Sequence, residues 1–293
     1  MSRRGNRRKN RGRIVNGILV LDKPGGLSSN EALQKAKRLY NAAKAGHTGS
    51  LDPLATGVLP LCFGEATKLS QFLLDADKRY RVLVELGRRT DTGDAEGKVI
   101  DSVESVTVTL EQVQAVMAGF VGVIDQTPPM HSAIKQQGVP LYKLAREGKV
   151  VELEIEVHCS KGTYVRTLAD EIGQQLGCGA HVKALRRLQA GVFSETEAVS
   201  LEQLEAAAGQ MEKGDYSAID DLLLAMDSAV LDLPEVVLPD LTAGWIKQGQ
   251  PVLVRHLPAT GLVRLYHGED FIGIGSILDD GRVAPRRMIM DTQ

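Results

Sequence analysis

The chain has 293 residues, 43% hydrophobic and 25% charged, which is an ordinary composition for a globular protein large enough for more than one domain. No apolar run approaches the length of a transmembrane helix, and residues 2–13 lack the apolar core of a signal peptide. Three cysteines without a CxxC pair argue against a disulfide scaffold and a zinc site, so we expect a cytoplasmic protein with reduced thiols.

Charge is distributed unevenly along the chain. The formal net charge is −2, but seven of the 35 basic residues and no acidic one lie in the first thirteen positions, which leaves 28 basic against 37 acidic residues elsewhere. The seven are Arg3, Arg4, Arg7, Arg8, Lys9, Arg11 and Arg13. A basic arm (residues 1–13) on an acidic body is typical of nucleic-acid-binding proteins, although a solvated disordered tail has the same composition.

The first 225 residues predict alternating strands and helices. An apolar run at 17–21 predicts a strand, and the capping box at 28–31 (SSNE) predicts a helix through about Tyr40. The elements predicted next are a helix over about 66–74, a strand over 80–86, a helix over about 110–120, a strand over 152–158 and a helix over about 164–176, ended by Gly177 and Gly179. Because these elements lack a regular βαβ rhythm, we expect an α+β fold on a mixed sheet.

The sequence pattern changes after Ala225. Four prolines separate short predicted strands, such as those over 262–266 and 271–274; they are Pro234, Pro239, Pro251 and Pro258. Turn sequences at 268–270 (GED) and 279–281 (DDG) connect such strands. We therefore predict a main domain over 14–225, a linker over 226–235 and a small all-β module over 236–293.

The strongest chemical signal is the segment 46–57, GHTGSLDPLATG. Three glycines and Pro53 exclude a helix or a central strand, and Pro53 biases Asp52 toward an extended or turn conformation. The carboxylate of Asp52 is thus expected on a stiff loop, where it suits nucleophilic or general-base chemistry. From the residues alone, an Asx-turn or helix-cap role for Asp52 stays open.

This segment resembles the catalytic loop of the bacterial tRNA pseudouridine-55 synthases, the TruB family, with Asp52 at the family's nucleophile position. Other segments match the family in the same order: 17–24 (GILVLDKP), 78–80 (KRY), 89–94 (RTDTGD), 128–135 (PPMHSAIK), 159–166 (CSKGTYVR) and 177–181 (GCGAH). The resemblance extends over nearly the whole chain. It implies a tRNA pseudouridine synthase that flips uridine 55 out of the T-loop and isomerises it, with the T-arm of tRNA as partner and the chain acting as a monomer.

The resemblance also implies that Arg166 pairs with Asp52 and keeps the carboxylate ionised and oriented. If so, the pKa of Asp52 should lie below its ordinary value. The residues alone offer a different partner, because Arg166 and Asp170 are spaced i,i+4 on a predicted helix, as in routine surface ion pairs.

Four further residues acquire roles by resemblance. Tyr80 would stack on the flipped uracil and is a candidate proton acceptor, and Tyr164 would point into the same cleft. His47 would pack into the RNA where the base leaves the stack, and Leu185 would form a pocket wall. Core or loop-bonding roles remain open for all four.

No metal and no cofactor are predicted. Asp91, Asp94 and Glu96 lack the distal bidentate glutamate of a calcium loop, so we interpret them as turn residues near the cleft. The sequence also contains no glycine-rich phosphate loop or dinucleotide fingerprint. Arg286 and Arg287 resemble the end of the RNA-binding module called PUA, a looser match than that of the catalytic loop.

One segment departs from the family. Family members carry additional residues between the region 143–148 and the strand before Cys159, whereas here Gly148 runs almost directly into that strand. Either the protein lacks a strand beside its site or the printed sequence omits a segment. We favour omission, because losing the strand would expose a sheet edge beside the cleft.

Two other functions remain open from the sequence. The chain could be an RNA-binding or tRNA-folding module that needs no catalysis, with the basic arm and the β module dominant. Alternatively, Asp52 could be the nucleophile of a glycosidase that releases uracil.

Overall fold

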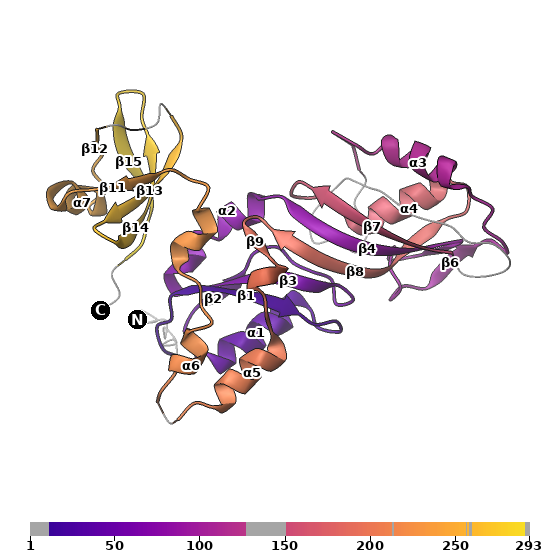
Figure 1. The fold of residues 1–293 in the computed structure, drawn as a ribbon, viewed down its shortest axis with the longest axis horizontal. Coiled ribbons are helices and arrows are strands. Elements are labelled where there is room, and N and C mark those ends of the chain that lie inside the picture. The colour runs from indigo at the N-terminus through magenta and orange to yellow at the C-terminus, as the bar shows by residue number, and fades with distance from the viewer. Residues whose placement is uncertain (1–11, 127–150, 213, 256, 258–259, 291–293) are drawn as a thin grey trace, which may run out of the picture.

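The computed structural model describes residues 12–126, 151–212, 214–255, 257 and 260–290 (Figure 1). An eight-stranded sheet runs through the larger part of the molecule in the order β10-β1-β3-β8-β4-β7, with β2 paired to β3 and β9 to β8. Its strands are β1 (Gly17–Lys23), β2 (Ala45–His47), β3 (Thr56–Phe63), β4 (Lys78–Leu86), β7 (Val151–Cys159), β8 (Ala180–Ala190), β9 (Phe193–Ser194) and β10 (Val199–Ser200). Parallel and antiparallel neighbours both occur, which confirms the predicted α+β fold on a mixed sheet.

Helices cover this sheet and bury its largest hydrophobic cluster. They are α1 (Ser29–Leu39), α2 (Ser70–Asp75), α3 (Leu110–Ala118), α4 (Val165–Gln175), α5 (Leu201–Gly209) and α6 (Ser217–Asp220), with the 3₁₀ helices η1 (Gly64–Lys68), η2 (Glu195–Glu197) and η3 (Met226–Val230). The predicted capping box is confirmed: Ser28 caps α1, and Glu31 bonds back to Ser28. In Figure 1, α1 and α5 lie beside the β1 half of the sheet and α4 beside the β4–β8 half.

The two halves of the large sheet meet over a very short distance. Strands β3 and β8 pair in parallel only at Thr56–Arg186 and Gly57–Arg187. Gly57 has φ of 99°, and a Cβ there would lie 2.2 Å from the carbonyl oxygen of Arg187, so this crossing requires glycine. The loop that carries Asp52 leads directly into β3 at this junction.

The C-terminal part forms the predicted β module. Its five strands, in the order β11-β13-β14-β15-β12, are β11 (Glu235–Val237), β12 (Val252–Leu253), β13 (Leu262–His267), β14 (Asp270–Ile277) and β15 (Arg282–Met288). The turns expected at Gly268 and Gly281 are present, and both glycines have positive φ. The sequence did not predict the helix α7 (Asp240–Lys247), which packs on this sheet.

A second hydrophobic cluster joins the module to the larger part. Ile274 of β14 is fully buried there together with Ile18 and Val20 of β1. The segment predicted as a linker contributes to the same cluster, because Ala229 and Val230 of η3 are buried in it. The division of the chain into 14–225, 226–235 and 236–293 stays a prediction.

In the described part of the chain, strand β7 forms the edge of the large sheet next to β4. A separate two-stranded ribbon consists of β5 (Arg88–Thr90) and β6 (Val99–Ser102). The matched segment 128–135 and the departure near Gly148 lie outside the described residues. Among the described helices, none has the length and apolarity needed to cross a membrane.

Candidate active site

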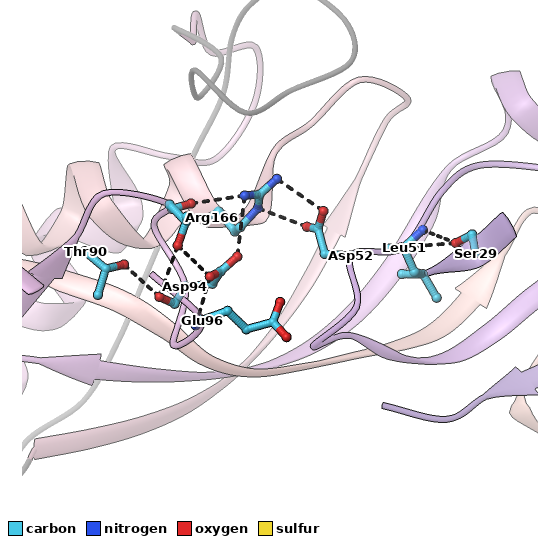
Figure 2. Close-up of polar contacts among 8 residues, drawn as sticks. Ser29, Leu51, Asp52, Thr90, Asp94, Glu96 and Arg166 are labelled. Carbon is cyan, nitrogen blue, oxygen red and sulfur yellow. Dashed lines mark hydrogen bonds and ion pairs between the residues drawn. The ribbon is translucent and has the colours of Figure 1, made fainter. Parts of the chain in front are cut away.

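The loop between β2 and β3 is held by buried polar groups on both sides of Asp52. The hydroxyl of Ser29, which is 3% exposed, accepts a hydrogen bond from Leu51 N at 2.7 Å and donates to Leu51 O at 3.1 Å (Figure 2). Beyond Asp52, the carbonyl oxygen of Pro53 accepts from Gly26 N at 2.9 Å and from Lys23 Nζ at 3.3 Å. The aspartate therefore stands on a loop that is fixed before and after it, as the sequence predicted.

The guanidinium of Arg166 contacts both carboxylate oxygens of Asp52. Its Nε lies 2.9 Å from Oδ2, and its Nη2 donates to Oδ1 at 3.3 Å (Figure 2). Arg166 stands in the first turn of α4 and is buried. Asp170, the alternative partner, instead accepts a bidentate pair from Arg89 at 2.6 and 3.0 Å. The i,i+4 interpretation of Arg166 is thus wrong, because the side chain turns into the cleft and not along the helix.

A second carboxylate contacts Arg166, which the sequence reasoning missed. Asp94 is 4% exposed, and its Oδ2 lies 3.4 Å from Arg166 Nη1, which also donates to Thr92 O at 3.1 Å. The other oxygen of Asp94 accepts from Thr92 Oγ1 at 2.6 Å and from Glu96 N at 3.1 Å. Asp94 is a turn residue, as predicted, but it also orients the arginine. The matched run RTDTGD was its signal in the sequence.

The pKa of the Asp52 carboxyl depends most on its burial and on the charges of Arg166 and Asp94. Burial raises the pKa of the carboxyl above its ordinary value, Arg166 lowers it, and the neighbouring charge of Asp94 raises it again. The expectation of a depressed pKa is therefore wrong in its net sign, because burial outweighs the guanidinium. Since 41% of the Asp52 side chain remains exposed, solvent screens these interactions.

Tyr80 lies on β4, partly buried against the main hydrophobic cluster. Burial raises the pKa of its phenol, whereas the charge of Arg187 and a side-chain hydrogen bond with it lower that pKa. The charge of Asp52 raises it further. Asp52, Arg166 and Tyr80 therefore form one electrostatic group, with Tyr80 protonated at neutral pH.

The other three predicted site residues lie on β2, at the start of α4 and on β8. His47 ends β2, its Nδ1 has no hydrogen-bond partner in the described part of the structure, and burial lowers its pKa, so the ring is neutral at pH 7. Tyr164 is the N-cap residue of α4, two positions before Arg166. Leu185 is 7% exposed on β8, opposite Val82 of β4. Their contacts with RNA stay predictions.

Comparison with known proteins gives consistent matches along the chain. Residues 37–155 match the TruB family pseudouridylate synthase N-terminal domain, 166–231 the tRNA pseudouridylate synthase B C-terminal domain, and 234–289 the C-terminal domain of pseudouridine synthase II TruB. The tRNA pseudouridine synthase B of Yersinia enterocolitica is 53% identical over 97% of this chain and 94% of its own, and that of Serratia proteamaculans is 52% identical over 97% and 98%.

Solved structures agree with these matches. The chain of the archaeal box H/ACA sRNP Nop10-Cbf5 complex has a TM-score of 0.70 at 27% identity, covering 94% of this chain and 87% of that one. An H/ACA RNP bound to a substrate RNA containing 2′-deoxyuridine contains a chain with a TM-score of 0.72 at 25% identity, covering 98% and 92%.

The class that the family models and the curated relatives name is pseudouridine synthase. The chain belongs to the TruB family of pseudouridylate synthases, which confirms the predicted family, enzyme class and type of fold. The alignment with the Yersinia enterocolitica protein spans 310 positions, more than the 293 residues of this chain, so that relative has residues without a counterpart here.

Proposed function

We propose that this protein converts uridine 55 in the T-loop of tRNA to pseudouridine, with Asp52 as the nucleophile. The observation that carries the proposal is the Asp52 carboxylate, fixed on its loop and bracketed by the two nitrogens of Arg166. The choice of RNA is supported by relatives that are named tRNA pseudouridine synthase B and match nearly the full chain.

The reaction keeps every atom of the nucleotide. The bond between uracil N1 and ribose C1′ breaks, a bond between uracil C5 and C1′ forms, and the proton of C5 is transferred so that N1 ends protonated. An aspartate can promote this by attacking C1′ or uracil C6, and both routes stay open. Neither requires an oxidant, a reductant or an energy source, so we propose no cofactor.

The roles of the surrounding residues follow from their chemistry. Arg166 opposes the effect of burial on Asp52 and so favours the ionised, nucleophilic form. The neutral phenol of Tyr80 suits stacking on an extruded uracil. As a phenolate, once its own proton has passed to uracil N1, it is the candidate acceptor for the C5 proton. We propose that His47 packs into the RNA at the place in the stack that the base leaves. Tyr164 and Leu185 are proposed to form the walls of the pocket around the base.

RNA recognition is proposed to combine several regions. Recognition of a folded T-arm depends on its shape and its phosphates, which the basic arm and the exposed Arg286 and Arg287 of the PUA-like module can contact. We infer a monomer that acts in the cytoplasm, with residues 14–225 as the catalytic domain, 226–235 as the connection and 236–293 as the RNA-binding module.

In the test, a T-arm transcript is incubated with the protein. The mass of the RNA, the release of free uracil and the carbodiimide adduct that pseudouridine keeps are then measured. We expect unchanged mass and one retained adduct, at uridine 55. The matched control is a transcript with cytidine at that position. Release of uracil would indicate a glycosidase, and binding without either product would indicate an RNA-binding protein. Both outcomes contradict the proposal.

A further inference from the structure

Arg187 is a buried cation whose role the proposed reaction leaves unexplained. Its side chain on β8 is 1% exposed. The Nε donates to Val58 O at 2.6 Å and the Nη2 to Gly49 O at 3.1 Å. No carboxylate of the described ranges forms an ion pair with it. A buried charge without a counter-charge is costly to fold, so a purely structural origin is unfavourable.

The neighbouring Arg186 shows what an ordinary arginine does on this strand. It forms a bidentate pair with Asp22 at 2.9 and 3.0 Å, and its Nε lies 2.5 Å from Glu195, while 32% of its side chain stays exposed. Alternation along β8 points the two arginines to opposite sides. Arg186 is neutralised near the surface, and Arg187 enters the junction between the sheet halves.

The partners of Arg187 come from three elements that meet at the site. Gly49 lies three residues before Asp52 on the fixed loop, Val58 belongs to β3, and Tyr80 is the register partner of Arg187 on β4. At Gly49, with φ of 87°, the position of a Cβ lies only 3.6 Å from Arg187 Nη1. One guanidinium thus connects the Asp52 loop to the sheet junction, and the pairing of β8 with β4 places Arg187 beside Tyr80.

We propose that Arg187 is a positioning residue of the reaction, which holds the Asp52 loop and the Tyr80 phenol in fixed relation so that both act on the same nucleotide. The inference rests on the proposed roles of Asp52 and Tyr80. The charge of Arg187 also favours proton loss from Tyr80, because it partly offsets the rise in pKa that burial causes. A phenol with a lower pKa loses its proton more readily, and its phenolate can then accept the proton from C5.

The experiment compares the wild type with Arg187→Met, Arg187→Lys and the matched control Arg186→Met. Single-turnover rates are measured at saturating T-arm RNA. We expect Arg187→Met to be slower by about 100-fold, the cost of a small misplacement of reacting groups, with RNA affinity changed only a few-fold. Arg187→Lys should recover part of the rate, because a point charge cannot reproduce the fork. Arg186→Met should react like the wild type.

A second readout needs no RNA. The titration of Tyr80 is followed in the free protein by NMR of ¹³Cζ-labelled tyrosine, with Tyr80→Phe used to assign its signal. Ionisation should move to higher pH in Arg187→Met, move less in Arg187→Lys and stay unchanged in Arg186→Met. If the wild type makes no pseudouridine, the proposed function fails, while this titration still tests the interaction between Arg187 and Tyr80.

The inference is overturned if Arg187→Met matches Arg186→Met in rate, or if the Tyr80 titration is unmoved. Should Arg187→Met fail to fold, Arg187→Lys decides, since it keeps the buried charge. A rate about tenfold below that of the wild type in Arg187→Lys, with native thermal stability and RNA affinity, supports the positioning role. A wild-type rate in Arg187→Lys overturns it.

Discussion

The larger part of the molecule and the C-terminal module differ in what they bury. All buried Lys, Arg, Asp and Glu side chains of the described ranges belong to the larger part; they are Lys23, Lys78, Glu85, Asp94, Arg166 and Arg187. The described core of the module is made of apolar residues such as Val236, Ile246 and Val263. Burying a charged side chain costs free energy of folding. The contrast therefore indicates that the larger part is less stable than an apolar core would make it, because it holds the charged groups of the candidate site. The core of the module carries no such cost.

The largest expected effect is at Asp52. In Asp52→Asn, the single-turnover rate should fall by roughly 10⁴-fold or more, as when a nucleophile is removed, because an amide cannot form the covalent bond. T-arm affinity should stay within a few-fold. Asp279→Asn, in an exposed turn of the module, is the control and should leave both quantities unchanged. Turnover near the wild-type rate in Asp52→Asn would remove it from the nucleophile role.

The next effect tests the apolar packing between the two parts. Ile274 of β14 is fully buried in the cluster shared with β1, so Ile274→Ala should lower the free energy of unfolding by about 2–5 kcal/mol. The exposed Leu253 of the same module provides the control Leu253→Ala, which should change it by less than about 0.5 kcal/mol. Urea unfolding followed by fluorescence and circular dichroism measures both. A small decrease in Ile274→Ala would mean that the module is only loosely attached.

The smallest effect concerns the basic arm. Arg13 forms a bidentate pair with Asp220 and lies 4.0 Å from the centre of the Tyr216 ring, so it belongs to the folded protein. A deletion of residues 2–11 leaves Arg13 in place and should weaken tRNA binding. The slope of log affinity against log salt should fall by about 0.7–0.9 for each phosphate that the arm neutralises in the wild type. The control is a variant of equal length in which the basic residues within 2–11 are replaced by uncharged ones. An unchanged slope would make the arm a passive tail.

Much of the fold was predictable because local signals agreed with the tertiary structure. The capping box at Ser28, the alternation in β7 and the glycines that follow α4 each fixed an element near its observed bounds. The helix α7 was missed because Pro239 and Pro251, which flank it, indicated short strands and turns. The packing of η3 into the second cluster depends on long-range interactions, which local periodicity does not report.

The candidate site was predictable where a residue stood in a distinctive segment. Asp52 and Arg166 were identified, but the net direction of the Asp52 pKa was not, because burial depends on the whole cleft. The sequence did not single out Arg187, because it cannot distinguish the buried Arg187 from the neighbouring, partly exposed Arg186. Only the pairing of β8 with its neighbours shows which of the two side chains is buried. Ser29 appeared only as part of a cap, although its hydroxyl also holds Leu51.

The proposed chemistry depends most directly on the coupling of Asp52 to Arg166, and the pH dependence of the single-turnover rate tests this coupling. The guanidinium lowers the pKa of Asp52, so its removal in Arg166→Met should raise that pKa and shift the acidic limb of the profile to higher pH. Arg166→Lys should shift it less, because a lysine lacks the fork. Arg186→Met should leave the limb where it is. An acidic limb in Arg166→Met that coincides with the wild type would contradict the pairing and the site built on it.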